Sequence, residues 1–324
     1  MLNKSSYFNL INAANVTSGI LSKNFVKSEQ EFLSFDCECN GLPVLIEADE
    51  TIFDFEDQQV FELEQSAVCQ KVYGHNDLSY VGFTHAYQKF KFLSQFRVKS
   101  DFWNQFQMIV EQNNKVKRYV GELKNDISKI GSFQTRNIPH SGHEAIIEAM
   151  LAQCDHVVIN PVIGPKKAGD VKLDALQMVF ENLAKLKYRG KISFMPIMAN
   201  MFYAGPLEAI HHAVLRQTLG FGLFSIGRDH AGAAGMYMAN AAVDLAKRQY
   251  DNLDISLMCH QGAAYCQSCD RAVLIGECGC DKSLLQDIAG SDFRDALKRK
   301  RAYPFADLKL QDFIQNLNLE LFEQ

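Results

Sequence analysis

Residues 127–160 read ISKIGSFQTRNIPHSGHEAIIEAMLAQCDHVVIN, and this stretch decides the fold. Residues 127–133 have the short apolar pattern of a buried strand, and residues 144–153 carry apolar side chains at helical spacing. Residues 156–160 again form a short apolar run. A strand, a helix and a second strand in this order predict a βαβ unit with both strands in one parallel sheet.

The same alternation continues downstream. We predict a helix over 171–188, a strand over 192–195, a helix over 207–218 and a strand over 223–226. This rhythm predicts an α/β fold in which helices cover the faces of a parallel sheet. Since ligands of such sheets bind at the carboxyl ends of the strands, the loops that follow these strands are the expected functional region.

The flanking regions have different patterns. Residues 1–105 look β-rich, because short apolar runs such as 42–46 and 80–83 lie between Gly, Asn and Asp turn signals. Helix-like spacing over 101–119 leads into the next domain. The tail carries a cluster of cysteines and then a basic, helix-like run at 294–301. These changes predict three domains, which span residues 1–105, 106–255 and 256–324.

Composition excludes several classes of protein. The chain has 324 residues, of which 47% are hydrophobic and 22% charged, and its formal net charge is -5. It has no basic excess to hold a nucleic-acid backbone, so nucleic acid is not expected as a partner. It has no apolar run near the roughly 20 residues that span a bilayer, and its first residues lack the apolar core of a signal peptide. We therefore expect a cytoplasmic protein that does not bind membranes.

The loop after the first predicted strand carries the sequence QTRNIPHSGHE, residues 134–144. It places His140 and His143 at the start of the predicted helix, where free backbone N–H groups and the helix dipole attract anions. Phosphoryl-type transfer needs mainly positioning and neutralisation of charge, and two imidazoles with Arg136 in one turn are suited to it. A metal site or a chance surface pair is the alternative for the histidine pair taken alone.

Three further loops lie at the same predicted edge of the sheet. Residues 160–170 read NPVIGPKKAGD, residues 201–209 read MFYAGPLEA, and residues 227–232 read GRDHAG. Glycines in such loops let the backbone approach an anion closely, and Arg228 offers a charge-assisted hydrogen bond. Each loop also has a plainer explanation, namely a solvated lysine loop, an ordinary helix start and a charged surface turn.

Together the four motifs resemble the sulfate adenylyltransferase (ATP sulfurylase) family, which carries Q-T-R-N-P-x-H-R-A-H, N-P-x-x-G-x-x-K-x-G-D, M-R-Y-A-G-P-R-E-A and G-R-D-H-A-G in this order. The resemblance is clear over residues 125–300 and weaker before them. It implies a Rossmann-like nucleotidylyltransferase domain, an N-terminal PUA-like β domain and a small C-terminal domain. The implied reaction is an in-line attack of sulfate on the α-phosphorus of ATP, which gives adenylyl sulfate and pyrophosphate. Mg²⁺ would accompany ATP, and the chain would form a homodimer.

The resemblance also implies roles for single residues. Gln134, Arg136 and the backbone N–H of Ala231 would bind the sulfate oxygens. His140 and His143 would hold the ATP phosphates and stabilise the transition state.

The remaining implied roles concern the nucleotide. Thr135 and Asn137 would position the α-phosphate region, and Arg228, Asp229 and His230 would line the nucleotide side of the pocket. The sequence contains no P-loop of the form G-x-x-x-x-G-K-[ST], so we do not expect the chain also to phosphorylate adenylyl sulfate.

Several positions depart from the family pattern. Ser141, Phe202 and Leu207 stand where the family has arginine, and Ile138 intervenes before Pro139. Each lost arginine that touched phosphate would cost about 1–3 kcal/mol. These losses leave two alternatives open: an adenylyltransferase for another oxyanion or a phosphorylated acceptor, and a non-catalytic pseudoenzyme that binds nucleotide.

A cluster of cysteines near the C-terminus has the spacing C-x2-C-x8-C-x-C. Its members are Cys266, Cys269, Cys278 and Cys280. Four thiolates can hold one tetrahedral Zn²⁺, which would be structural because no coordination position stays open. Cys259 and His260 are alternative ligands, and a group of free thiols without metal is the competing explanation.

Overall fold

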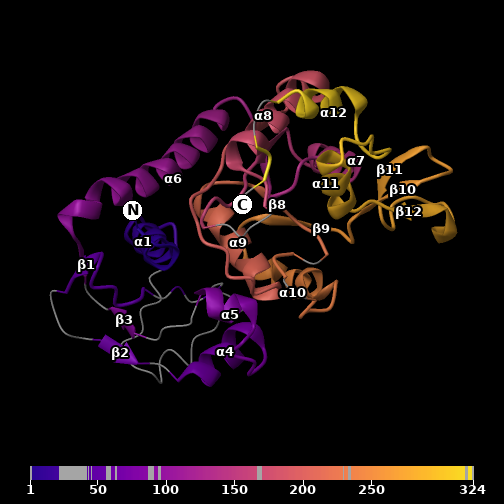
Figure 1. Cartoon of the computed structure of the whole chain (residues 1–324). Coiled ribbons are helices and arrows are strands. Elements are labelled where there is room, and N and C mark those ends of the chain that lie inside the picture. Colours follow the sequence, from indigo (N-terminus) through magenta and orange to yellow (C-terminus); the bar gives the residue numbers. More distant parts are fainter. Residues whose placement is uncertain are drawn as a thin grey trace.

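The computed structural model describes residues 2–21, 42, 44, 46–55, 60–62, 64–86, 91–93, 96–165, 170–228, 230–232, 235–317 and 320–322. At its centre lies a parallel sheet of five strands in the order β7-β6-β5-β8-β9. Strands β8 and β9 of this sheet are labelled in Figure 1. The strands are β5 (Ile130–Phe133), β6 (His156–Ile159), β7 (Ile192–Phe194), β8 (Leu223–Ile226) and β9 (Ser256–Cys259). The predicted α/β class with a parallel sheet is therefore confirmed.

Helices connect consecutive strands of this sheet, as the sequence rhythm predicts. They are α7 (Ser141–Leu151), α8 (Leu173–Leu183) with a π-helix at Ala184–Tyr188, α9 (Pro206–Thr218) and α10 (Ala241–Gln249). Helix α9 starts at Pro206, whose fixed φ suits the first helical position. The strand order runs outward from β5 in one direction through β6 and β7, and then reverses to β8 and β9. Such a reversal is the topological switch point at which doubly wound sheets bind ligands.

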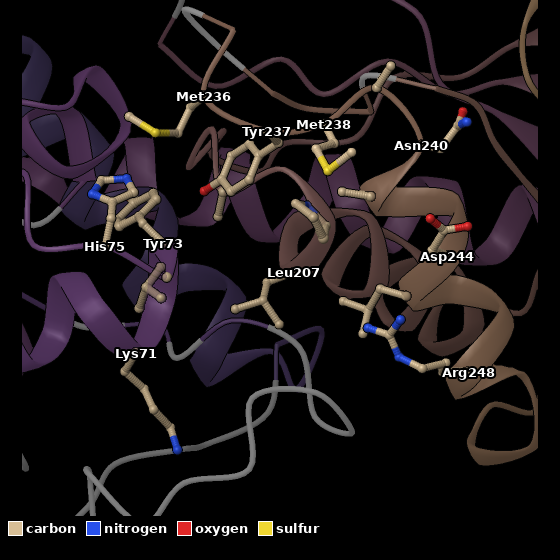
Figure 2. Close-up of a pocket in the computed structure, with 17 residues that line it drawn as sticks. Lys71, Tyr73, His75, Leu207, Met236, Tyr237, Met238, Asn240, Asp244 and Arg248 are labelled. Carbon is tan, nitrogen blue, oxygen red and sulfur yellow. The ribbon is translucent and has the colours of Figure 1, made fainter.

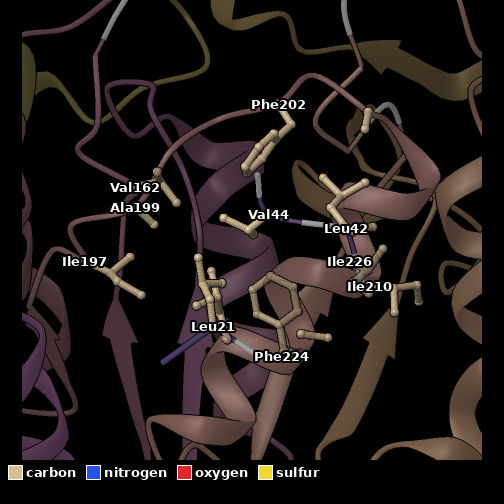
Figure 3. Close-up of a cluster of buried hydrophobic side chains, with 14 of the residues drawn as sticks. Leu21, Leu42, Val44, Val162, Ile197, Ala199, Phe202, Ile210, Phe224 and Ile226 are labelled. Atoms are coloured by element: carbon tan, nitrogen blue, oxygen red, sulfur yellow. The ribbon is translucent and has the colours of Figure 1, made fainter. Parts of the chain in front are cut away.

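Both faces of the sheet are buried. Val158 on β6 and Phe224 on β8 face one core, which also contains side chains of α6 (Trp103–Leu123), α9 and α10. Figure 3 shows Phe224 in this core with Ile210 of α9. Val157 and Ile159 flank Val158 on β6 and point to the opposite face. They lie in a second core with α7, α8 and the C-terminal helices. Successive side chains of a strand point to opposite faces, so a strand buried on both faces reads as a continuous apolar run.

The N-terminal part contains more helix than the sequence suggests. Its described elements are α1 (Lys4–Thr17), α4 (Gln65–Tyr73), α5 (Val81–Ala86) and two short antiparallel pairs, β1 (Phe53–Asp54) with β4 (Arg97–Val98) and β2 (Val60–Glu62) with β3 (Lys91–Leu93). The β-rich prediction is thus wrong for most described residues of this part. In particular, the run at 80–83 leads into helix α5. The prediction failed here because an apolar run this short does not distinguish a strand from a buried helix. The run at 42–46 falls only partly on described residues.

Helix α1 is buried on nearly all sides, and amide side chains bind it to the loop after β7. Asn15 of α1 and Asn113 of α6 (Trp103–Leu123) both donate to the carbonyl oxygen of Met198, at 2.9 and 2.8 Å. Asn200 Nδ2 donates to Asn12 Oδ1 at 2.7 Å. These bonds fix the loop after β7, so the N-terminal helix supports the edge of the sheet where ligands are expected.

The C-terminal part begins inside the central sheet. The predicted boundary at 256 coincides with the first residue of β9, and the boundary at 105 falls within α6. An antiparallel sheet follows, in the order β11-β10-β12, with β10 (Ala263–Cys266), β11 (Arg271–Leu274) and β12 (Leu285–Asp287). Helices α11 (Gly290–Lys298) and α12 (Leu308–Gln315) complete the chain, and α11 accounts for much of the predicted basic run. None of the described helices combines the length and hydrophobicity that a bilayer span requires.

Two glycines in helices give a matched test of this packing. A Cβ on Gly82 of α5 would lie 2.7 Å from the carbonyl oxygen of Phe202, whereas a Cβ on Gly121 of α6 would meet nothing within 4 Å. We expect Gly82→Ala to lower the free energy of unfolding by about 1–3 kcal/mol, the cost of overpacking. Gly121→Ala should raise it by about 0.5–1 kcal/mol, because alanine loses less entropy in a helix. Urea denaturation measures both, and equal effects would contradict the close approach of α5 to the 202 loop.

Candidate active site

A cavity of about 280 Å³ opens at the carboxyl edge of the central sheet. Loops that follow β5, β6, β7, β8 and β9 all contribute to its wall. Eight of the predicted site residues line it: residues 134–137, His143, Arg228, His230 and Ala231. The fold therefore brings together motifs that lie nearly 100 residues apart, at the switch point between β5 and β8.

One predicted site residue, His140, does not line the cavity, and another, Asp229, is not described. His140 is buried behind His143, where it packs against Phe293 of α11. Asp229 lies outside the described residues, as do Lys166 and Lys167 of the lysine loop.

The two histidines of the H-x-x-H motif cap helix α7. His140 Nδ1 accepts a hydrogen bond from the Gly142 N–H at 3.2 Å, and His143 Nδ1 accepts one from the His140 N–H at 3.4 Å. Their ring centroids lie 4.0 Å apart. Because both Nδ1 atoms accept, the neutral rings carry their protons on Nε2. His143 Nε2 lies 3.4 Å from Thr135 Oγ1 at the cavity wall.

Burial keeps these two rings neutral in the absence of an anion. It lowers the pKa of His140 to about 4. Burial, together with the neighbouring His140 and His260, lowers the pKa of His143 well below its usual value. The positive charges that line the described part of the cavity are instead the guanidinium groups of Arg136 and Arg228, opposed by the carboxylate of Asp170. The arrangement favours an anion of small size, supported by the N-terminal end of α7.

Strained backbone marks two wall residues. Tyr203 and Ala231 are not glycines, yet their φ angles are +55° and +53°. Such conformations cost about 1–3 kcal/mol each and persist only where surrounding contacts enforce them. The hydroxyl of Tyr80 donates to the Tyr203 carbonyl at 2.7 Å, and the Gly205 N–H donates to the Ala231 carbonyl at 3.3 Å. The two strained residues are thus held in place by bonds from outside the cavity.

The sequence analysis named His260 as an alternative zinc ligand. The structure corrects this prediction, because His260 lines the cavity. His260 Nε2 lies 3.0 Å from Ser225 Oγ, and its Nδ1 accepts from the Gly262 N–H at 3.1 Å, so both ring nitrogens are engaged. A Cβ on Gly227 would lie 2.7 Å from this ring, which explains the glycine. A sequence signal could have identified His260, because this residue directly follows an apolar run. The structure shows that run to be the sheet strand β9.

The three positions with a lost arginine do not line this cavity. Phe202 is 1% exposed and belongs to the same apolar core as Phe224 (Figure 3), and its ring packs against Phe8 with ring centroids 5.6 Å apart. Leu207 lines a second cavity of about 1130 Å³ between α4 and α10, together with Lys71 and Arg248 (Figure 2). Ser141 lies at the start of α7, where its N–H donates to the Phe305 carbonyl at 2.8 Å. The described charges of the smaller cavity thus lie at other positions, on Arg136, Arg228 and Asp170.

The four clustered cysteines converge beside the turn between β10 and β11. The Sγ atoms of Cys269 and Cys278 lie 3.8 Å apart, and those of Cys269 and Cys280 lie 3.6 Å apart. Cys278 Sγ lies 3.6 Å from Cys266 Sγ, and all four sulfur atoms fall within 4.8 Å of one another. The backbone N–H of Cys269 lowers the pKa of Cys266 to about 7, which favours its thiolate.

Comparison with known proteins links the chain to one family. A family model described as ATP-sulfurylase matches residues 110–306. The sulfate adenylyltransferase of Pyrococcus abyssi is 32% identical over 250 residues, which cover 76% of this chain and 65% of the relative. The enzyme of the same description from Thermococcus onnurineus is 30% identical over 272 residues, which cover 78% of this chain and 71% of the relative. The chain thus matches about two thirds of the length of these two relatives.

A solved structure supports the fold. A hexameric APS kinase from Thiobacillus denitrificans superposes with a TM-score of 0.62 over 96% of this chain and 62% of its own. The two sequences are 10% identical, so this likeness concerns the fold alone.

The buried histidines make stability depend on pH. Burial lowers the pKa of His140 and His260 to about 4 and that of His211 and His230 to about 3. Below pH 6.5 the unfolded chain binds protons that the folded chain does not, so the free energy of unfolding falls as the pH decreases toward 4. Each group contributes a slope of up to about 1.4 kcal/mol per pH unit. Urea denaturation between pH 7.5 and 5 should show this loss, and His211→Phe should reduce the slope. A flat profile would contradict the burial of neutral histidines.

Proposed function

The chain belongs to the ATP-sulfurylase family, and from this premise we propose that it is a sulfate adenylyltransferase. In this reaction a sulfate oxygen attacks the α-phosphorus of ATP and forms a P–O bond. The bond between the α-phosphorus and the bridging oxygen to the β-phosphate breaks, and pyrophosphate leaves. The observation that carries the proposal is the convergence of residues 134–137, His143 and Arg228 on one cavity at the switch point of the sheet.

The geometry of this cavity suits two anions that react with each other. Its volume of about 280 Å³ lies near the lower limit of about 300 Å³ for ligand pockets, so it fits the sulfate and the α-phosphate better than a whole nucleotide. We assign the sulfate to Gln134, Arg136 and the Ala231 N–H. Gln134 supports this assignment because its side chain lies at the wall, and among the described residues it makes a single weak contact, from Nε2 to Met201 Sδ at 3.9 Å.

The histidine pair has a separate role in the proposal. His143 would donate its Nε2–H to a phosphate oxygen, and His140 would hold the ring of His143 in this tautomer through its backbone N–H. Thr135 and Asn137 would position the α-phosphate, since the Asn137 N–H donates to Thr135 Oγ1 at 3.1 Å and orders this turn. Donors that are already oriented stabilise the developing charge without reorganisation.

The nucleotide side of the pocket belongs to the loop after β8. We assign Arg228, Asp229 and His230 to it. Mg²⁺ would be carried by the ATP phosphates, where it neutralises charge on the leaving pyrophosphate. Asp170 is the carboxylate that the described part of the wall offers nearby.

Sulfate fits this cavity better than another acceptor. A different acceptor was suggested by the missing arginines at Ser141, Phe202 and Leu207, but none of the three contributes to the cavity wall. Intact charged residues at the wall likewise favour an active enzyme over a pseudoenzyme.

Further proposals concern the rest of the chain. We propose that the four cysteines hold a structural Zn²⁺, since the edge of a tetrahedron with Zn–S bonds of about 2.3 Å measures about 3.8 Å and their sulfur atoms lie at similar spacing. We propose that residues 1–105, with their two antiparallel pairs, correspond to the family's PUA-like domain, residues 106–255 to its catalytic domain and residues 256–324 to its C-terminal domain. Family membership also supports a homodimer in the cytoplasm.

The first test is ATP formation from adenylyl sulfate, pyrophosphate and Mg²⁺ by the purified protein. We expect robust turnover, and His143→Ala should reduce kcat by about 10²–10³, the effect of removing one preorganised donor. His75→Ala is the matched control, because His75 lines the other cavity, and its turnover should stay within about twofold. If the folded wild type binds ATP but forms none from adenylyl sulfate, sulfate is not the acceptor.

The zinc proposal is tested by metal analysis. We expect about one Zn²⁺ per chain in the wild type and much less in Cys278→Ser, together with a lower melting temperature, because metal binding contributes to folding free energy. Cys259→Ser is the control and should keep its zinc, because Cys259 lies outside the cluster. Wild-type protein purified without zinc, and indifferent to added zinc in thermal melting, would support free thiols.

A further inference from the structure

A chain of buried ionisable side chains leads from the wall of the cavity into the protein. His230 lines the cavity, and its Nε2 lies 3.1 Å from His212 Nδ1. On the other side of the same ring, His212 Nε2 lies 3.5 Å from Glu208 Oε1 without a hydrogen bond to any described residue, so Glu208 is the nearest described carboxylate that a proton on this nitrogen faces. His212 and Glu208 occupy successive turns of α9 and are fully buried. The order from surface to interior is therefore His230, His212, Glu208.

Glu208 is held as a hydrogen-bond acceptor at the buried end. Its Oε1 accepts from the Phe202 N–H at 2.8 Å, and its Oε2 accepts from the Ala204 N–H at 2.9 Å. Burial raises the pKa of this carboxyl to about 7, although the backbone N–H groups of Phe202, Ala204 and Tyr203 and the charge of Arg136 oppose the rise. A carboxyl with such a pKa changes its protonation readily near neutral pH.

The surroundings of the chain carry positive charge. Arg216 is fully buried on the same helix, where its Nε and Nη2 donate to the side chain and carbonyl of Asn160 at 3.0 and 2.9 Å. Among the described residues, the other ionisable groups that face the chain are His211 on α9, His260 after β9, Arg136 after β5, and the hydroxyls of Tyr203 and Tyr237. With Glu208 ionised, Arg216 and Glu208 balance each other. With Glu208 neutral, one positive charge remains next to the cavity.

Hydrogen-bond logic fixes the resting tautomers. The negative charge of ionised Glu208, 3.5 Å from His212 Nε2, favours the neutral His212 tautomer with its proton on Nε2. His212 Nδ1 then accepts from the Nε2–H of His230. His230 is then left with an unprotonated Nδ1. A lone pair at the wall of an anion site repels phosphate oxygens, so this state suits the empty cavity and not the occupied one.

We propose that Glu208, His212 and His230 form a proton relay that takes up one proton from solvent when the ATP phosphates enter the cavity. The proton binds to His230 Nδ1, the Nε2 proton of His230 moves to His212 Nδ1, and the Nε2 proton of His212 moves to Glu208. All three groups end neutral, His230 presents Nδ1–H to phosphate, and the uncompensated Arg216 attracts the anion. His230 is a binding residue in this scheme, while His212 and Glu208 are positioning residues. The relay rests on the proposed function, because it needs an anionic substrate in this cavity.

The test is the number of protons taken up when MgATP binds without sulfate. Calorimetric titrations at pH 8 in Tris and in triethanolamine, which ionise with different enthalpies, give this number. We expect about one proton for the wild type and fewer at pH 6, because Glu208 is already protonated there. In His212→Gln the amide retains a donor and an acceptor, but it cannot take a proton on one nitrogen and release another as the imidazole does. This variant should bind ATP with proton uptake near zero.

His211→Gln is the matched control. It places the same substitution on the adjacent buried residue, outside the relay, and should keep an uptake of about one proton. ¹⁵N spectra of histidine-labelled, ligand-free wild type test the resting state independently of any variant, and the Nε2-protonated form is expected for both His212 and His230.

The outcomes separate the two proposals. Binding of ATP without proton uptake by the wild type, or an Nδ1-protonated His230 in the ligand-free protein, would overturn the relay and leave the proposed reaction intact. Unchanged uptake in His212→Gln would also overturn it. Failure of the folded wild type to bind ATP would contradict both.

Discussion

The loops that follow the neighbouring strands β5 and β8 lead the chain to opposite faces of the sheet. The cavity exists because these two loops diverge. Helix α7, which follows β5, packs in one core, and α10, which follows β8, packs in the other. The gap between the loops exposes backbone N–H groups and side chains to a common space. Every charged residue of the candidate site lies on a loop at this edge, so the site depends on the strand order more than on any single contact.

A second layer of buried polar groups keeps the loops in shape. Glu208 binds two backbone N–H groups of the 202–204 loop, and Arg216 binds Asn160 at the end of β6. Buried charges of this kind add little net stability as a pair, but the loss of one partner is strongly destabilising. Their contribution is to define one conformation, including the strained Tyr203 at the cavity wall. The N-terminal helix adds to this through Asn200.

The substitutions that distinguish this chain from its family have a common structural explanation. Phe202 replaces a cation by an apolar core residue, and Leu207 lines a neighbouring cavity. Both lie close in sequence to residues of the candidate site, yet their side chains point away from it. The charges at the described cavity wall come from other positions, namely Arg136, Arg228 and Asp170.

The sequence alone determined the central architecture, because apolar periodicity is set locally and each strand and helix between 130 and 226 was predicted within a few residues. It also identified the motif residues Gln134 to Asn137, His143 and Arg228, since glycine, histidine and arginine in loops after strands have few structural uses. Tertiary structure decided the rest. The placement of His260 in the cavity, the position of His140 behind His143, and the helical N-terminal part all depend on contacts between residues far apart in the chain, which no local pattern records.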